Sequence, residues 1–344
     1  MKERAYPVYT VNKHAEGLLV GGHPWVYENN ILHAPDTEPE NGALADVVSP
    51  KGAYLGTGFV SLHSKIRVRL ISRNANDTFD AAFWRRRVEY AWAYRKTVLE
   101  PADLTACRVI FGEADQFPGL TVDRFNDILV TQTLSVGMEK LKPVLFPLLA
   151  EVLRADGQTI AGIYERNDEA LRAKEGLEQN KGWFDLPGET HPASTQTEIC
   201  ENGVFYHVDF ENGQKTGFFL DQKYNRRAVA RLAAGHTVLD CFTHTGFSSR
   251  SVMPQSVPCT SAARLLSSST SDSAAPSSRH SARGMDITTT RPLSYSSMSA
   301  TIRASMASRT GDFVRNSALF TGPTSMPRSI SAAAMRCVRA VVLA

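Results

Sequence analysis

A change in composition at residue 250 limits how much of this 344-residue chain can form a packed fold. Residues 250–344 contain eleven Arg and three Asp but neither Lys nor Glu, so their net charge is +8, against −5 for residues 1–249. Charged residues average about a quarter of a globular domain, and both missing types are among the commonest residues. We therefore expect folded domains in residues 1–249 only.

Three explanations compete for residues 250–344. Their twenty-one Ser suit a disordered Arg/Ser-rich RNA-binding arm, but such arms repeat Arg-Ser or Arg-Gly, or also use Lys. A diverged domain is the second explanation. We favour the third, a shifted reading frame in a GC-rich gene, because it accounts for the loss of Lys and Glu and for six of the eight Met. The segment is predicted to be non-homologous, out of frame and disordered, and the nucleotide sequence decides between the three.

The sequence predicts neither a membrane nor a secreted protein. No apolar run approaches the roughly 18 to 20 residues of a membrane span, and the N-terminus has no apolar signal-peptide region. The five Cys are scattered, odd in number and without a CxxC pair, which favours reduced thiols and argues against zinc. We predict a cytoplasmic protein that binds no membrane and no metal. The oligomeric state stays open, with a homodimer as one alternative.

Residues 1–72 are expected to form a small β-rich domain. Residues 43–50, 53–61 and 65–72 are short runs with β-branched residues and partial alternation, separated by Gly and Ser-Pro. This pattern is typical of an antiparallel sheet or a partly open barrel. Trp25 follows His23-Pro24, and on the residues alone a core aromatic after a turn is the favoured interpretation.

Residues 73–188 are expected to form a central α/β domain. Apolar residues recur at helical spacing over residues 77–99, with Asp77 or Thr78 as N-cap. Arg85, Arg86 and Arg87 on this helix could touch phosphate, although a solvated face is the favoured interpretation. Strands within residues 106–135, a helix over residues 138–155 and a strand within residues 159–168 follow.

Residues 189–249 read as the start of a doubly wound domain. Asp221 is the expected N-cap of a helix over residues 222–232, and residues 237–242 form a compact apolar strand. Ligands bind where such a strand ends, and there Asp240 offers a carboxylate while Gly246 lets the backbone come close. The loop has a single Gly, so it is neither a dinucleotide fingerprint nor a phosphate loop. An adenosine with a short amino-acid arm fits it better.

At three places the chain resembles a known family. "GQKTGFFLDQKYNRR" (213–227) with "VLDCFTHTG" (238–246), "GGHPWVYENNI" (21–31) and "GEADQFPGLTVDRF" (112–125) are similar to motifs of the class I S-adenosylmethionine-dependent large-subunit rRNA cytosine-C5 methyltransferases. The resemblance implies a PUA RNA-binding domain, a central α/β domain and a Rossmann-like catalytic domain. The expected fold is thus α/β with an N-terminal β-rich PUA-like barrel and an incomplete Rossmann-like methyltransferase domain at the C-terminus.

The resemblance also implies site residues. S-adenosylmethionine would contact a wall formed by Lys215, Thr216, Gly217, Phe219, Asp221 and Gln222, and a loop with Asp240, Phe242, Thr245 and Gly246. Large-subunit ribosomal RNA would be the partner. The candidates for RNA contact in the PUA domain are His23, Pro24, Trp25, Lys65, Arg67 and Arg69, where base stacking and phosphate charge share the work.

The residues that the family uses for its chemistry are missing from this sequence. Methylation of cytosine C5 needs a Cys thiolate that adds to C6, and the family places this Cys and a D-P-P-x-F motif beyond the first Rossmann strand. After Gly246 there is no D-P-P, and neither Cys259 nor Cys337 stands in a comparable setting. We assign no catalytic residue and expect little or no activity. The alternatives are an RNA-binding protein without catalysis and a methyltransferase for another base or for protein.

Overall fold

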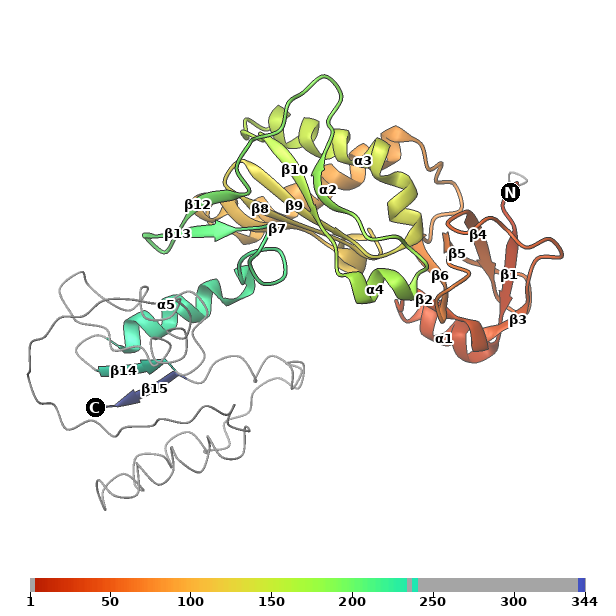
Figure 1. Ribbon diagram of the computed structural model, residues 1–344. Helices are drawn as coiled ribbons and strands as arrows, with labels where there is room; N and C mark the ends of the chain where they lie inside the picture. Colours follow the sequence, from red (N-terminus) through yellow and green to blue (C-terminus); the bar gives the residue numbers. More distant parts are fainter. Residues whose placement is uncertain (1–3, 234–236, 241–339, 344) are drawn as a thin grey trace, which may run out of the picture. The chain divides into compact units, whose positions relative to one another are not determined.

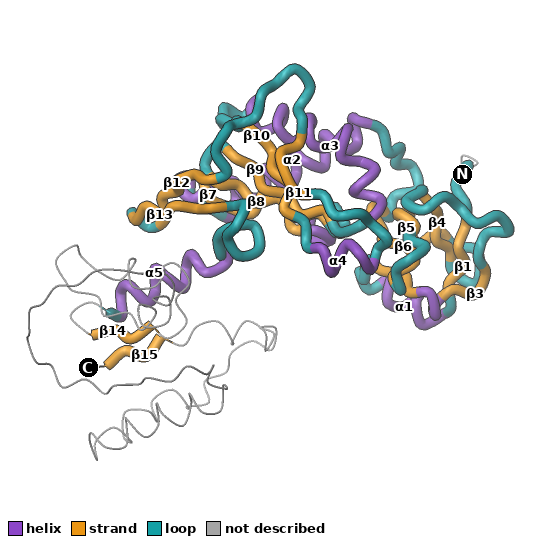
Figure 2. Tube along the Cα trace, in the orientation of Figure 1, coloured by secondary structure: helices purple, strands orange, loops and turns teal. Residues whose placement is uncertain are grey.

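The computed structural model describes residues 4–233, 237–240 and 340–343, and the chain divides into two compact units (Figures 1 and 2). In the smaller unit, β14 (Thr237–Asp240) pairs antiparallel with β15 (Ala340–Leu343). A strand therefore replaces the predicted disorder at residues 340–343. The rest of the predicted disordered segment lies outside the described residues.

The larger unit begins with a six-stranded sheet, here called the N-terminal sheet. Its strands are β1 (Val8–Val11), β2 (Trp25–Tyr27), β3 (Ile31–His33), β4 (Leu44–Val48), β5 (Tyr54–Val60) and β6 (Ile66–Ser72). They lie in the order β2-β6-β5-β4-β1-β3, with only β1 and β4 parallel. The strands predicted within residues 43–72 are confirmed. The sequence did not predict β1, nor the helix α1 (Lys13–Val20) that Asn12 caps.

A five-stranded sheet with helices follows, here called the central domain. Its elements are α2 (Ala81–Val98), β7 (Ala106–Phe111), β8 (Leu120–Phe125), β9 (Ile128–Thr133), α3 (Val136–Ala155), β10 (Gly162–Arg166), α4 (Glu169–Lys174) and β11 (Lys181–Phe184). The strand order is β11-β10-β9-β8-β7, and β9 and β10 are the parallel pair. The strands and helices predicted within residues 77–168 are confirmed, apart from their ends.

The predicted N-cap of α2 is wrong by two to three residues. Asp80 caps the helix, because its carboxylate accepts a hydrogen bond from the Phe83 amide at 2.8 Å. Asp77 is engaged elsewhere and accepts hydrogen bonds from Ser72 and Asn74. Asp77, Thr78 and Asp80 are all possible N-caps by residue type. Spacing alone does not show that Asp77 is already bound to other side chains.

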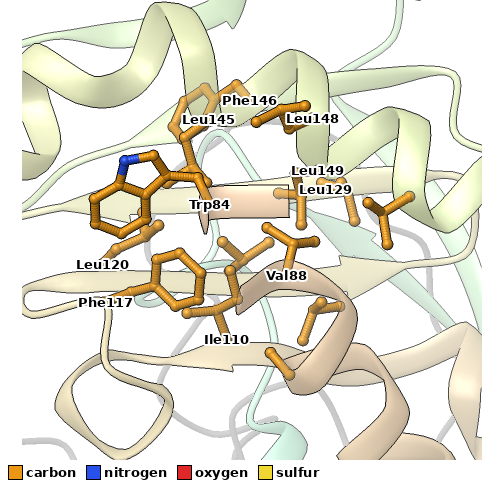
Figure 3. Packing of buried hydrophobic residues seen from close by; sticks show 14 of the residues in the cluster. Trp84, Val88, Ile110, Phe117, Leu120, Leu129, Leu145, Phe146, Leu148 and Leu149 are labelled. Carbon is orange, nitrogen blue, oxygen red and sulfur yellow. The ribbon is translucent and has the colours of Figure 1, made fainter. Parts of the chain in front are cut away.

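The largest core lies between the central sheet and its two long helices (Figure 3). Trp84 and Val88 of α2 pack with Leu145, Phe146 and Leu149 of α3 and with Ile110, Leu120 and Leu129 of the strands, and all are buried. Fully burying one such side chain stabilises a fold by about 1.5–3 kcal/mol. This core fixes β8 and β10, whose polar side chains reach the candidate site.

The larger unit ends with a hairpin and a helix. The hairpin joins β12 (Gln196–Glu201) to β13 (Val204–Asp209), and the short 3-10 turn η4 (Leu220–Gln222) leads into α5 (Lys223–Leu232). Asp221 is not the N-cap as predicted, because it lies inside η4 and Gln222 takes that place without a side-chain hydrogen bond. The buried Lys223 anchors the helix by donating to the Ala106 carbonyl at 2.7 Å and pairing with Asp103.

Candidate cofactor and RNA sites

A tight turn over residues 209–217 connects β13 to the Lys215-Thr216-Gly217 sequence. The Asp209 carboxylate accepts the amides of Glu211 and Asn212 at 3.0 and 2.7 Å. These contacts, the Asn212 amide foremost, hold the pKa of Asp209 below its usual value. Gly213 and Gly217 donate their amides to the carbonyls of Asp209 and Gln214. The short polar side chain and the two glycines thus specify the turn locally.

Gly217 cannot be replaced without strain. Its φ of +121° lies in the region that favours glycine, and a Cβ would come within 2.9 Å of Val208 Cγ1. Lys215 is left-handed as well, with φ at +53°. The turn therefore holds an unfavourable backbone shape, which needs support from its surroundings.

The central domain supplies that support through the Arg166 guanidinium, at the end of β10. Arg166 donates hydrogen bonds to the carbonyl oxygens of Glu211, Gly213 and Lys215. Three main-chain acceptors on one turn thus share a single planar cation, whose five donors have a fixed geometry. The shape of the turn depends on a residue about fifty positions earlier in the chain.

A second support comes from Asp123 on β8. This carboxylate is fully buried, accepts the Thr216 hydroxyl at 2.6 Å and pairs with the Arg108 guanidinium at 2.7 and 3.0 Å. Thr216 is itself buried, so its hydroxyl serves this internal contact. Because an unpaired buried carboxylate is costly, Asp123, Arg108 and Thr216 depend on one another.

The predicted cofactor residues with polar side chains that remain accessible are Lys215 on the turn and Asp221 and Gln222 in η4 just after it. Lys215 is exposed and lies 5.2 Å from the centre of the half-buried Phe219 ring. Asp221 is exposed and accepts a hydrogen bond from Gln222 at 3.0 Å. Their charges and amide complement the groups of S-adenosylmethionine, which carries a carboxylate, an ammonium and ribose hydroxyls. Thr216 and Gly217 shape the wall from inside.

The second predicted wall is described only in part. Asp240 is the last residue of β14, and Phe242, Thr245 and Gly246 lie outside the described residues. The structure therefore brings together the six candidates from residues 215–222, and their role in cofactor binding stays a prediction.

Two of the predicted RNA contacts join the N-terminal sheet to the central domain instead of facing solvent. The Trp25 indole donates to Glu113 at 2.9 Å. Arg69 pairs with Glu175 at 2.6 Å and with Glu113 at 3.7 Å, and its guanidinium lies 5.7 Å from the Trp25 ring. Ser61 completes the contact by donating to Glu175 at 2.9 Å. These contacts engage the Trp25 Nε1 and both terminal nitrogens of the Arg69 guanidinium inside the protein.

The other four RNA candidates differ in exposure and in the contacts that their side chains make within the protein. Lys65 is exposed, whereas Arg67 donates to the Ser61 carbonyl and pairs with Glu28. His23 and Pro24 are half-buried beside Trp25, and the His23 and Trp25 rings lie 5.7 Å apart, edge to face. RNA contact by any of the six stays a prediction.

Sequence reasoning missed the residues that hold the turn. Asp123 lies inside the quoted stretch 112–125 and Arg166 at the end of a predicted strand, yet neither was singled out. A buried ion pair between Arg226 and Glu201, with one oxygen at 2.6 Å from the guanidinium, was missed as well. Asp123 is a charged residue at an inward position of a predicted strand, and this pattern could have pointed to it.

Comparison with protein families matches two parts of the chain. The family described as a PUA-like domain matches residues 10–73, which covers the N-terminal sheet except for the first two residues of β1. The family described as S-adenosylmethionine-dependent methyltransferase matches residues 183–264, which covers the hairpin, the turn and β14. The predicted PUA-like domain, the α/β fold class and the methyltransferase cofactor agree with these matches.

Curated relatives extend the likeness across the central domain. Ribosomal RNA large subunit methyltransferase I of Shewanella denitrificans is 41% identical over 231 residues, which are 67% of this chain and 56% of the relative. The protein of the same name from Klebsiella pneumoniae is 35% identical over 246 residues, or 72% of this chain and 59% of the relative. The chain thus spans less than three fifths of their length.

Solved structures share the fold. A Streptococcus mutans protein described as a SAM-dependent methyltransferase has a TM-score of 0.56 at 22% identity, over 71% of this chain and 60% of its own. A methyltransferase structure complexed with SAH has a TM-score of 0.58 at 23% identity, over 71% and 59%.

Among the residues that the structure describes, no helix combines the length and the hydropathy that crossing a bilayer requires. Most of the N-terminal sheet and all of the turn lie within the residues that the two family models match. The chain therefore belongs, over the matched region, to the PUA-containing S-adenosylmethionine-dependent methyltransferases whose curated members are named ribosomal RNA large subunit methyltransferase I.

Proposed function

We propose that the chain derives from an enzyme that transfers a methyl group from S-adenosylmethionine to a cytosine C5 of large-subunit rRNA. The observation that carries the proposal is the exposed Lys215 of the Lys-Thr-Gly turn, followed in η4 by Asp221 and Gln222, in a chain 41% identical to a large-subunit rRNA methyltransferase. Lys215 would pair with the carboxylate of the methionine arm, and Asp221 would accept hydrogen bonds from the ribose hydroxyls or the ammonium group. Bound S-adenosylmethionine supplies the electrophilic methyl group.

We also propose that this polypeptide does not catalyse that reaction. The target base needs a thiolate nucleophile, and residues 250–344 contain Cys259 and Cys337 without a D-P-P motif near either. The activity that remains is RNA binding, since the match to a PUA-like domain covers residues 10–73 without interruption. The proposed localisation is cytoplasmic, where the RNA substrate is.

Methyl transfer tests both proposals in one experiment. Unmodified large-subunit rRNA is incubated with labelled S-adenosylmethionine and either this chain or a version whose reading frame is restored after codon 246. The account predicts label in cytosine C5 for the restored version only, and RNA retention by both in a filter-binding assay. Methylation by the original chain would overturn its inactivity, and label on another base would overturn the cytosine assignment.

A calorimetric titration with S-adenosylmethionine distinguishes the methyltransferase lineage from an RNA-binding protein without catalysis. RNA binding without heat of cofactor binding in the restored version would favour an RNA-binding protein of a non-catalytic lineage. Saturable heat in the restored version supports the methyltransferase lineage.

A further inference from the structure

An exposed aromatic stripe runs along α2. Tyr90 and Tyr94 are 63% and 56% exposed, although large aromatic side chains usually bury most of their surface. Residues four apart lie on the same face of a helix, so the two rings are neighbours on one side of α2. Tyr90 also borders a hollow of about 170 Å³, lined by Arg87, Tyr90, Ala91, Ala114, Asp115 and Gln116.

The charge around the hollow is positive. Arg87 lines the hollow, and Arg86 precedes it on α2; within the described residues neither forms an ion pair. Both guanidinium groups lie over the Phe83 ring, and Arg87 also donates to the Ile71 carbonyl at 3.2 Å. The one acid lining the hollow, Asp115, is neutralised by the buried Arg95 at 2.6 and 2.8 Å. Asp77 also acts on the Arg87 guanidinium, and Glu89 is exposed three residues after Arg86 on α2.

The rim of the hollow carries an amide in an unfavourable backbone conformation. Gln116 has a φ of +64°, a left-handed value that a residue with a side chain rarely adopts. Its exposed side-chain amide forms no hydrogen bond with any described residue. Such conformations cluster at binding sites, and an amide that both donates and accepts can read the edge of a nucleobase.

We infer that this hollow binds a base of single-stranded RNA, stacked on Tyr90, with Gln116 at the base edge and Arg86 and Arg87 on the adjacent phosphates. Proteins bind single-stranded RNA by stacking its bases on aromatic rings and by placing guanidinium groups against its phosphates. Tyr94 receives the neighbouring base. The hollow adjoins the residues that bind the N-terminal sheet, because Glu113, the acceptor of Trp25, directly precedes Ala114. An RNA strand held by the N-terminal sheet can therefore continue onto α2.

The inference rests on the proposed RNA substrate, so its test separates the two. A short fluorescent single-stranded RNA is titrated with the full chain and with Tyr90→Ala, Tyr90→Phe and Arg87→Ala. Loss of one stacked base weakens binding roughly fivefold to a hundredfold, whereas Tyr90→Phe keeps most of the affinity. Arg87→Ala lowers the slope of log K against log salt by about one.

Two residues serve as matched controls. Phe205 on β13 is exposed to a similar extent, at 61%, and Arg85 lies beside Arg86 on α2 but is paired with Glu151. Phe205→Ala and Arg85→Ala are expected to bind RNA within twofold of the wild type. The large exposure of Tyr90 means that its replacement leaves the melting temperature unchanged.

Three outcomes overturn the inference. If the unaltered chain binds no single-stranded RNA, the RNA function fails along with it. If the chain binds but Tyr90→Ala matches Phe205→Ala, only the hollow fails as an RNA site. If Tyr90→Ala changes the sedimentation coefficient and leaves RNA affinity intact, the stripe belongs to a contact between two copies of this chain.

Discussion

The central domain holds the N-terminal sheet and the turn over residues 209–217 by different means. Toward the N-terminal sheet it offers carboxylates, Glu113 and Glu175, which meet side chains of the sheet. Toward the turn it offers Arg166 to main-chain carbonyls and Asp123 to a buried hydroxyl. The first contact fixes where a preformed sheet sits, whereas the second fixes the backbone of the turn itself. Breaking the two should therefore have different consequences.

The largest effect is expected for Asp123→Ala. Breaking a buried ion pair costs about 3–5 kcal/mol, and partial exposure of Arg108 brings the expected loss of unfolding free energy to about 3 kcal/mol. Urea denaturation checks this value. Asp185, an exposed acid outside any ion pair of the described residues, is the matched control, and its Ala variant should change stability by less than about 0.5 kcal/mol. A cost for Asp123→Ala as small as this control would refute the central role of the carboxylate.

Glu175→Ala breaks the other contact and should cost less. Arg69 loses its nearest partner but keeps Glu113 at 3.7 Å and the Trp25 ring, so we expect about 2 kcal/mol. Limited proteolysis should show cleavage between the N-terminal sheet and the central domain, with the turn still protected. Glu28→Ala removes an exposed pair with Arg67 and should cost under about 0.5 kcal/mol. Equal proteolysis of the Glu175 and Glu28 variants would contradict the assignment.

Trp25→Phe sharpens the comparison by removing one hydrogen bond. The ring remains, but the bond to Glu113 is lost, which costs about 1 kcal/mol. Thermal unfolding measures this loss, and RNA affinity should stay within twofold. A tenfold loss of RNA affinity with unchanged stability would instead assign Trp25 to the RNA surface.

The last prediction concerns the alkylation of two thiols and changes no residue. Burial raises the pKa of Cys107 to about 11, while Cys200 on the hairpin is exposed. The folded-state pKa of Cys107 lies above that of an ordinary thiol, so at pH 8 only about one Cys107 in a thousand is a thiolate. Mass mapping after a short alkylation of the native chain should find Cys200 labelled and Cys107 unlabelled. Equal labelling of the two would show that the core of the central domain is open.

The fold was predictable where the signal is local. The strands β4, β5 and β6 alternate, and α2 repeats apolar residues at helical spacing, so residues 43–99 follow from periodicity apart from the N-cap. The wrong caps of α2 and α5 have different causes. Asp77 accepts hydrogen bonds from its near neighbours Ser72 and Asn74, whereas Asp221 lies inside the 3-10 turn η4 that precedes α5.

The candidate site was also predictable only where its residues are neighbours in the sequence. Lys215, Thr216 and Gly217 are adjacent in sequence and were found by their motif. Asp123 meets Thr216 across 93 positions, and Arg166 meets the turn across 45 to 49. A single sequence records no such pairing, so the residues that hold the turn could be seen only in three dimensions.

Hydrogen exchange at the turn tests the central claim most directly. The account holds that Asp123 and Arg166 fix the backbone over residues 209–217, where the amides of Gly213 and Gly217 bond within the turn. Deuterium uptake at these two amides should rise at least tenfold in Asp123→Ala and in Arg166→Ala, with the amides of α2 unchanged. Uptake equal to that of the unaltered chain in both variants would show that the turn holds its own shape, which contradicts the account.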